Sequence, residues 1–225
     1  MNVPTCIGFI MDGNRRWAKE QSIPTIEGHR QGFDNVFLEL IRFIRDAEIP
    51  HAIFYAFSTE NWKRAEAEVS SLMALFSELL TRMKEDLAEQ GVQIRLVGRR
   101  QDFSFEQQEL MNEIEEKSRE YTGTTIWIAL SYGGRAEIVE AVNEAVRQGK
   151  QVDEASFETL LWTADLPDPD MIVRTSGEQR LSNFLTWKSA YSELYFIKKH
   201  WPALTKDDFA AILAEYAKRK RRYGT

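Results

Sequence analysis

The sequence Cys6-Ile-Gly-Phe-Ile-Met-Asp-Gly-Asn-Arg-Arg-Trp17 decides the fold that we expect for this chain. Its apolar first half is typical of a buried strand. Asp12 therefore falls at the carboxyl end of that strand, where open α/β sheets place their ligand crevice. Gly13 lets the backbone come close to a ligand, and the guanidinium groups of Arg15 and Arg16 suit phosphate oxygens. A carboxylate beside two guanidiniums indicates a metal and a phosphate held together, and a helix-capping turn is the alternative.

Apolar runs typical of buried strands recur along the chain and alternate with helical patterns of roughly 15 to 25 residues. This alternation is typical of a parallel sheet that is covered by helices. We therefore predict one α/β domain over residues 1–225, with a central, mostly parallel sheet of about six strands. The predicted strands are Cys6–Met11, His51–Phe57, Val92–Gly98, Thr125–Ser131, Met171–Arg174 and Leu194–Ile197.

Three helical stretches, at residues 30–47, about 66–90 and 134–147, carry apolar side chains at helical spacing. In 134–147 these are Ile138, Val139, Val142 and Val146. In 66–90 the stripe is wider and consists of Val69, Leu72, Met73, Phe76, Leu79, Leu80, Met83 and Leu87. This stripe fits a core face and also the wall of an apolar tunnel, because Met and Phe line adaptable ligand surfaces.

Composition excludes several classes of protein. The formal net charge of −6 argues against bulk binding of nucleic acid. Cys6 is the one cysteine, so the chain has no internal disulfide and no zinc-site spacing. The sequence shows no signal peptide and no apolar run long enough to span a bilayer. We expect a cytoplasmic protein.

Two further polar clusters follow predicted strands. In Ser58-Thr-Glu-Asn-Trp-Lys-Arg64, Ser58 and Asn61 are able to orient a substrate or pass on a proton, although the string also suits a helix entry. The stretch from Asp168 to Asn183 carries a second set of phosphate-binding side chains and a turn whose backbone donors suit anions. The side chains are Arg174, Arg180 and Ser182, and the turn is Thr175-Ser-Gly177. The alternative is that these arginines form only surface ion pairs.

A series of motifs runs in order through nearly the whole chain. They are Met11-Asp-Gly-Asn-Arg-Arg-Trp-Ala18, Gly28-His29, Tyr55-Ala-Phe-Ser-Thr-Glu-Asn-Trp62, Ser131-Tyr-Gly-Gly-Arg135, Arg174-Thr-Ser-Gly-Glu-Gln-Arg-Leu-Ser-Asn183 and Ser192-Glu-Leu-Tyr-Phe196. Together they resemble the motifs of the cis-prenyltransferases, and most of all those of the bacterial undecaprenyl diphosphate synthases. The resemblance implies a Mg²⁺-dependent transferase that condenses isopentenyl diphosphate onto an allylic diphosphate, usually farnesyl diphosphate. Successive cis additions then give a polyprenyl diphosphate carrier lipid, and the helix at 66–90 becomes the wall of a hydrophobic tunnel.

The resemblance also implies roles for individual residues. The catalytic set is Asp12, Asn61 and Ser58, with Asp12 and Glu193 linked to the metal. Positions that hold the allylic diphosphate are matched by Gly13, Asn14, Arg16, Trp17, His29 and Arg64. The mobile loop is matched by Ser58, Thr59, Glu60, Asn61 and Trp62, and the isopentenyl diphosphate pocket by Arg174, Arg180, Leu181 and Ser182. Thr25 stands where many members have an arginine, and we expect Arg15 to replace that charge.

The basic tail ends in Arg222-Tyr-Gly224, which resembles the C-terminal motif that reaches the partner's active site in a homodimer. Nucleic-acid binding by this tail is the weaker alternative. The competing function is a non-catalytic, partner-stabilising subunit of the same family, which Asp12, Arg174 and Arg180 argue against. A generic nucleotide-binding protein ranks last, because the first strand lacks the expected glycine pattern. By resemblance, Ala56 and Ile126 are candidates for the tunnel floor that sets product length, and membrane contact is expected only through the product.

Overall fold

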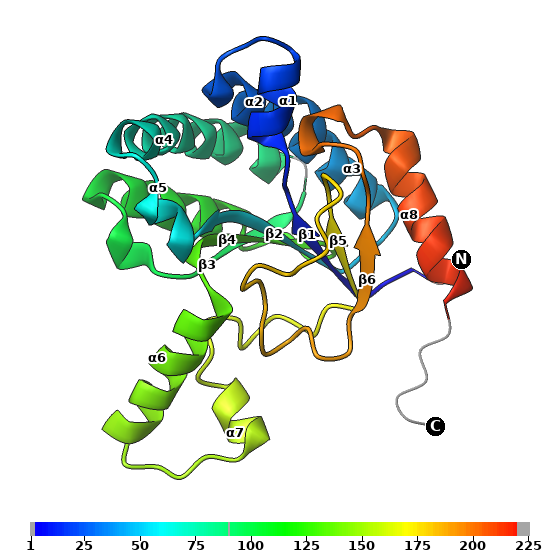
Figure 1. Cartoon of the computed structure of the whole chain (residues 1–225). Coiled ribbons are helices and arrows are strands. Elements are labelled where there is room, and N and C mark those ends of the chain that lie inside the picture. Colours follow the sequence, from blue (N-terminus) through cyan, green and yellow to red (C-terminus); the bar gives the residue numbers. More distant parts are fainter. Residues whose placement is uncertain (1–2, 90, 220–225) are drawn as a thin grey trace.

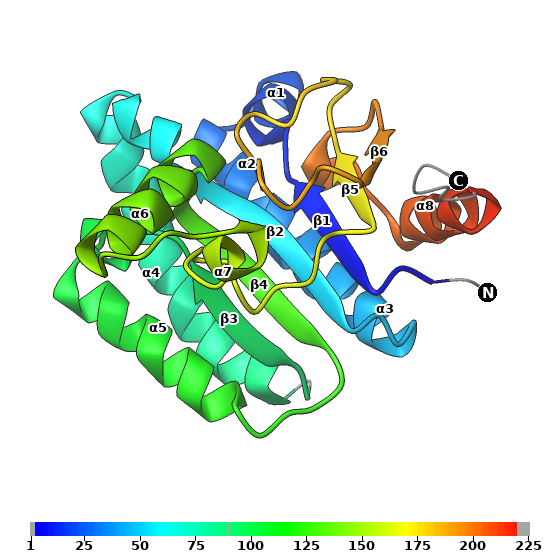
Figure 2. The same cartoon turned by 90° about the horizontal axis from the view of Figure 1, so that it is seen from below.

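Six parallel strands form the centre of the computed structural model, which describes residues 3–89 and 91–219. The strands lie side by side in the order β3-β4-β2-β1-β5-β6 (Figures 1 and 2). Each of their ends lies within one residue of the predicted end, so the predicted sheet is confirmed and is wholly parallel. The strands are β1 Cys6–Ile10, β2 His51–Ser58, β3 Gln93–Val97, β4 Thr125–Tyr132, β5 Met171–Arg174 and β6 Glu193–Phe196.

The first strand, β1, lies near the middle of the sheet and is buried along its whole length, as its continuous apolar run requires. It pairs with β2 on one side and with β5 on the other. The register places Ile10 opposite Tyr55 and Arg174. Because the strands are parallel, the three polar clusters that follow them meet at one edge of the sheet.

Helices cover one face of this sheet. The main core joins β1, β2 and β4 to α3, α4, α5 and α8, through residues that include Ile41, Leu80, Met111 and Ile212. The helices of this chain are α1 Asn14–Glu20, α2 Thr25–Gln31, α3 Leu38–Asp46, α4 Glu66–Glu89, α5 Phe105–Ser118, α6 Gly134–Arg147, α7 Glu154–Glu158 and α8 Lys206–Lys218. Short helical segments are η1 Gly32–Phe37, η2 Thr59–Lys63, η3 Arg100–Asp102 and η4 Trp201–Ala203. The predicted helix over 30–47 is thus interrupted by η1, a π-helical segment of the kind often found at functional sites.

The opposite face of the sheet is covered in another way. Irregular chain lies over it, and Leu166, Phe184 and Leu185 of this chain belong to one buried cluster with Trp127 of β4. The helix α6 lies with α7 in an arm that stands away from α4 and α5 (Figure 1). Only small side chains and Glu137 of α6 are buried there, and Val139, Val142 and Val146 are exposed. The predicted helix over 134–147 is confirmed, and its helical spacing shows that a face is apolar but not what covers that face.

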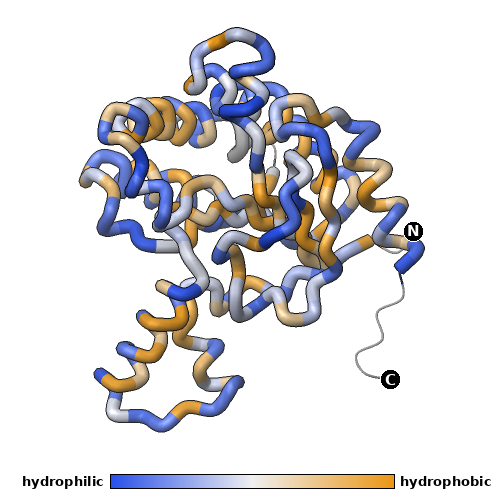
Figure 3. The backbone as a smooth tube through the Cα atoms, viewed as in Figure 1, coloured by the Kyte–Doolittle hydropathy of each residue, from blue (hydrophilic) through white to orange (hydrophobic). Residues whose placement is uncertain are grey.

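The hydropathy of the backbone follows this plan: hydrophobic residues gather on the strands, and α6 also carries them although it lies in the arm (Figure 3). Within residues 3–89 and 91–219, no helix combines the length and the apolar character needed to cross a membrane.

Candidate active site

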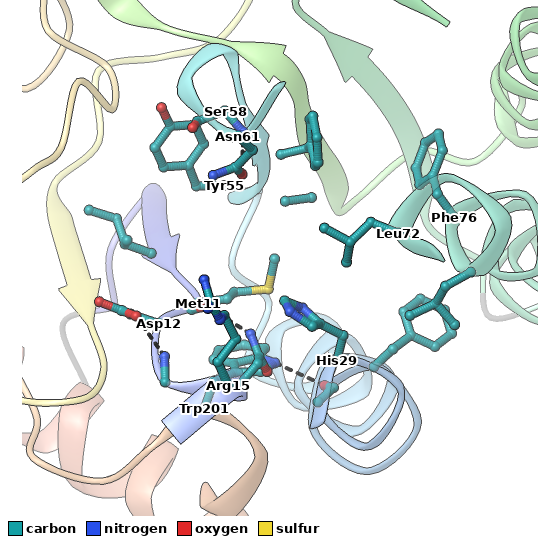
Figure 4. Close-up of a pocket in the computed structure, with 18 of the residues that line it drawn as sticks. Met11, Asp12, Arg15, His29, Tyr55, Ser58, Asn61, Leu72, Phe76 and Trp201 are labelled. Atoms are coloured by element: carbon teal, nitrogen blue, oxygen red, sulfur yellow. Dashed lines mark hydrogen bonds between the residues drawn. The ribbon is translucent and has the colours of Figure 1, made fainter. Parts of the chain in front are cut away.

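A cavity of about 1260 Å³ opens where the carboxyl edge of the sheet meets α1, α2 and α4. It is larger than the pockets of roughly 300–1,000 Å³ that usually bind small molecules. Figure 4 shows Asp12 on one side of it and Leu72 and Phe76 of α4 on the other. One end is thus polar and the other is a hydrophobic wall, so the tunnel between the sheet and the long helix is confirmed. The wall is made by Phe33, Phe37, Leu72, Met73, Leu75, Phe76, Leu79, Met83, Phe103, Ile128 and Leu130.

The turn that carries Asp12 is fastened from several directions. The backbone N–H of Gly13 donates to Asp12 Oδ1 over 2.7 Å. The Asp12 N–H donates to the Thr175 hydroxyl over 2.8 Å, and that hydroxyl also lies 2.6 Å from the Asp12 carbonyl. The N–H of Trp201 donates to the same carbonyl over 3.0 Å. The carboxylate therefore projects from a fixed backbone.

Gly13 is required in this turn for a steric reason. Its φ of +103° lies in the region that L-residues rarely adopt. A Cβ there would come within 2.6 Å of His200 Nδ1 and 2.7 Å of Ser176 Oγ. Any side chain at position 13 would push the Asp12 turn away from its neighbours.

Arg174, at the end of β5, contacts Asp12 and is far more buried than Arg16, which also contacts it. Its side chain is only 5% exposed, and Nη2 donates to Asp12 Oδ2 over 2.8 Å. Its Nη1 donates to Ser182 Oγ over 2.7 Å and to the carbonyl of Arg180. Partial burial would raise the pKa of Asp12, but Arg174 and then Arg16 outweigh it and hold the pKa below its usual value. Asp12 is therefore ionised at neutral pH.

The other guanidiniums at the polar end are more exposed. Arg16 lies 3.2 Å from Asp12 and 2.9 Å from Glu178. Arg64 and Arg15 share one carboxylate, Glu68, at 3.1 and 3.5 Å. Because solvent-exposed pairs of this kind are weak, these cations are free to exchange their carboxylate partners for the oxygens of a diphosphate.

Three buried polar atoms of the site have no hydrogen-bond partner among the described residues: Asn14 Oδ1, His29 Nε2 and Arg174 Nε. Burial, together with the charges of Arg64 and Arg15, lowers the pKa of His29 to about 4, so its imidazole is neutral near pH 7. Because most buried polar groups in proteins are paired, unpaired ones beside a cavity indicate a place for a ligand.

The second cluster forms η2 and the turn before it. Ser58 and Asn61 make a capping box, in which the Ser58 N–H donates to Asn61 Oδ1 over 3.0 Å. Both residues line the cavity, as do Glu60 and Arg64. The Asn61 amide nitrogen is a donor and never a base at neutral pH, so Asn61 is suited to orienting a group and not to accepting a proton unaided.

Several residues named from the sequence lie outside the cavity wall. Among the described residues, the cavity is not lined by Trp17, Thr59, Trp62, Arg180, Leu181 or Ile126, whereas Ala56 does line it. The structure does not bring Glu193 to Asp12: Glu193 opens β6 opposite Met171, at the other end of the strand from Arg174, and pairs with Arg219 at 2.8 Å. Arg222-Tyr-Gly224 and the Leu87 side chain lie outside the described residues.

The predicted anion cradle of backbone donors is also not formed. The N–H groups of Thr175, Ser176 and Gly177 donate to the carbonyls of Ile10, Lys199 and Ile197. The sequence pattern did not reveal that Thr175 fastens Asp12, or that Met11, Tyr55 and Trp201 line the cavity. The Trp201 indole donates to the Gly32 carbonyl over 2.9 Å, where η1 begins. No local pattern marks Trp201, because its contacts come from 169 residues away.

A divalent cation is compatible with this donor set. In the part of the chain that the structure describes, no group of three His, Cys, Asp or Glu side chains forms a metal cage. Mg²⁺, however, is commonly held by one or two carboxylates together with substrate phosphates. Asp12 is an ionised, half-buried carboxylate among arginines that suit phosphate, and so it fits that mode.

Comparison with known proteins agrees with this geometry. Residues 10–224 match the prenyltransferase family model that is described as undecaprenyl diphosphate synthase. The chain belongs to this family. It is 44% identical to the isoprenyl transferase of Thermotoga maritima, across 100% of this chain and 98% of that protein.

Two further relatives extend the comparison. The ditrans,polycis-undecaprenyl-diphosphate synthase ((2E,6E)-farnesyl-diphosphate specific) of Micrococcus luteus is 39% identical, across 99% of this chain and 92% of that protein. The crystal structure of lavandulyl diphosphate synthase from Lavandula x intermedia, in complex with dimethylallyl diphosphate, superposes with a TM-score of 0.93 at 32% identity, covering 99% of both chains. The protein is a cis-prenyltransferase of the undecaprenyl diphosphate synthase family, an enzyme of polyprenyl biosynthesis.

Proposed function

We propose that this enzyme condenses isopentenyl diphosphate onto farnesyl diphosphate in successive cis additions and releases a polyprenyl diphosphate. The observation that carries the proposal is the cavity itself, which joins arginine-bearing strand tips to a long apolar wall. A diphosphate suits the first end, and a growing prenyl chain suits the second. The farnesyl starter is supported by the name of the Micrococcus luteus relative.

In this proposal, two groups of residues hold the two diphosphates. Gly13, Asn14, Arg15, Arg16, His29 and Arg64 bind the allylic diphosphate, and Trp17 supports them from outside the cavity wall. Thr25 lines the cavity without a charge, and the nearby Arg15 supplies one. Arg174, Arg180 and Ser182 bind isopentenyl diphosphate, with Leu181 between them. The buried Arg174 connects the two groups, because it contacts both Asp12 and Ser182.

The catalytic roles fall to Asp12, Ser58 and Asn61. Asp12 would hold Mg²⁺ together with diphosphate oxygens, and the ion would supply positive charge against the negative charge of the leaving group. Asn61 and Ser58 orient the proton that is lost when the new double bond forms. Thr59, Glu60 and Trp62 keep this pair in place. Glu193 is not combined with Asp12 in one site, since the two lie toward opposite ends of the sheet.

The experiment that tests this function is incorporation of radiolabelled isopentenyl diphosphate with farnesyl diphosphate and Mg²⁺, followed by chromatographic sizing of the products. We expect a ladder that ends at one long polyprenol and disappears when EDTA removes the cation. Incorporation with dimethylallyl but not farnesyl diphosphate would contradict the proposed starter. Unchanged incorporation in EDTA would contradict the role of Mg²⁺.

We further propose a homodimer, for which the exposed apolar face of α6 offers a surface. Val139, Val142 and Val146 are 58%, 46% and 72% exposed and follow one another along the helix. A two-fold axis across this face would bury the same stripe of both copies. Light scattering after gel filtration should show a dimer that Val142→Asp converts to a monomer, and a monomeric wild type would contradict it. The cytoplasmic location and transient membrane contact through the product stay predictions.

A further inference from the structure

The segment η2 is fastened by a short series of hydrogen bonds that ends at a residue with no role so far. The indole Nε1 of Trp62 donates to Ser131 Oγ over 2.8 Å. The Ser131 hydroxyl in turn donates to Oδ2 of Asp102, the last residue of η3. We call Trp62, Ser131 and Asp102 the Trp62 anchor.

The direction of these bonds is fixed by chemistry. An indole N–H only donates, an ionised carboxylate only accepts, and a serine hydroxyl has one proton to give. Asp102 therefore decides where the Ser131 hydroxyl points. With that proton directed at Asp102, the Ser131 lone pairs are left to receive the Trp62 indole.

Ser131 is built into the sheet in an unusual way. It is completely buried and has a φ of +45°, a value that non-glycine residues seldom adopt. The pairing of β2 with β4 shifts here, from Phe57 opposite Leu130 to Ser58 opposite Tyr132, so Ser131 is an extra residue in its strand. Bulges of this kind redirect a side chain. Here the Ser131 hydroxyl oxygen accepts the Trp62 indole N–H.

The Trp62 ring is also part of the structure behind the cavity wall. It packs edge-on against Phe57 and Phe103, with ring centroids 5.0 and 5.7 Å away. Both of these phenylalanines line the cavity. On the other side of η2, Asn183 Nδ2 donates to Glu60 Oε1 over 2.8 Å. Asn61 lies between these two attachments.

We propose that Asp102 is a positioning residue for prenyl transfer, acting through Ser131 and Trp62 to hold Asn61 at the cavity. This inference rests on the proposed role of Ser58 and Asn61. Asp102 is itself exposed and does not line the cavity. Its effect on the reaction is therefore expected in the turnover number and not in substrate affinity.

The test compares Asp102→Ala with Asp102→Asn in the full-length enzyme. Asparagine keeps an oxygen that accepts the Ser131 hydroxyl and removes only the charge. We expect Asp102→Ala to lower kcat about tenfold with little change in either KM, because it removes a hydrogen bond to a charged group. Asp102→Asn should remain close to wild type. Glu106→Ala, which removes an exposed carboxylate four residues away, is the matched control and should have no effect.

A second readout reports on η2 without reference to activity. Trypsin cleaves after Lys63 and Arg64, and its rate in the native protein measures how firmly this segment is held. We expect cleavage there to be about tenfold faster in Asp102→Ala, with the melting temperature near that of wild type. Faster cleavage with unchanged kcat would overturn the positioning role and count against the proposed role of Asn61. A lower kcat without faster cleavage would overturn the anchor and leave the role of Asn61 standing.

The Trp62 end of the anchor gives an independent check. Trp62→Phe keeps an aromatic ring between Phe57 and Phe103 but removes the indole donor. If the anchor is one unit, Asp102→Ala combined with Trp62→Phe should lower kcat no further than Trp62→Phe alone. If the two substitutions lowered kcat by independent factors that multiply in the double variant, the proposal would be overturned. An Asp102→Asn enzyme with a kcat as low as that of Asp102→Ala would also overturn it.

Discussion

The two ends of the cavity are built in contrasting ways. At the polar end, Asp12 and Arg174 project from strand tips that hydrogen bonds hold in place on several sides. At the apolar end, the wall is formed mainly by the Leu, Met and Phe side chains of the long helix α4, together with η1, Phe103 and two residues of β4. The polar end holds its charged groups in fixed positions. The apolar end offers flexible side chains that can adapt to a ligand. The contrast suggests that the residues at the strand tips determine the chemistry, and that the residues of α4 determine the length of the product.

The largest expected effect is at Asp12. Asp12→Asn should lower kcat by about 10²–10³-fold, since it removes the charge that the proposed mechanism places at the leaving diphosphate. Asparagine is preferred to alanine, because its side-chain oxygen still accepts from Arg174 Nη2, whereas alanine would leave this buried donor unpaired, at a cost of about 1–3 kcal/mol. Steady-state kinetics with the melting temperature as control would check this. A normal rate in the asparagine variant would remove Asp12 from the chemistry.

His29, on α2 between the two ends, should make stability depend on pH. Its pKa of about 4 in the folded protein lies below the ordinary value of 6.5. The unfolded chain therefore binds a proton first as the pH falls, and stability is lost between pH 6.5 and about 4, by at most about 3 kcal/mol. Urea unfolding of wild type and His29→Gln across this range should show the variant losing less. Parallel curves would mean that His29 titrates normally.

Arg180 tests whether the polar end is divided between two diphosphates. Its side chain is 60% exposed and pairs with Glu178, so Arg180→Ala should leave the fold unchanged. We expect about a tenfold rise in KM for isopentenyl diphosphate, the usual size for a lost hydrogen bond to a charged group, and a smaller rise for the allylic substrate. Equal changes for both substrates would contradict the division.

The smallest effect on rate, and the clearest on product, is expected at the apolar end. Leu79→Trp on α4 adds bulk inside the cavity and should shorten the final product while the first addition proceeds at nearly the wild-type rate. The added volume should cost about 1–3 kcal/mol of stability. Thr81→Trp places the same ring on the exposed side of α4 and serves as the control. A shorter product from both variants would show that helix stability, and not cavity depth, is what changed.

The sequence predicted the structure best where the residues of a segment determine its conformation and its place in the sheet by themselves. Continuous apolar runs gave strands to within one residue, and the tips of β1, β2 and β5 were correctly expected at one edge. It failed where a partner decides the outcome. The valines of α6 have the spacing of a buried face, yet they are exposed in an arm. Nothing in the pattern shows that Thr175 fastens Asp12, or that Ser131 bulges within β4 and meets Trp62, since both depend on contacts distant in sequence.

The helix α4 has a consequence for how this enzyme can change over time. Its cavity-facing residues run from Leu72 to Met83, and each helical turn advances about 5.4 Å. A bulky residue moved along α4 by one turn would shift the point at which the growing chain meets an obstacle by that distance. Successive positions along α4 would therefore set product length in steps of one helical turn. Substitutions on α4 can change the position of the bulky residue without disturbing the strand tips. Product length can therefore diverge among relatives that catalyse the same reaction.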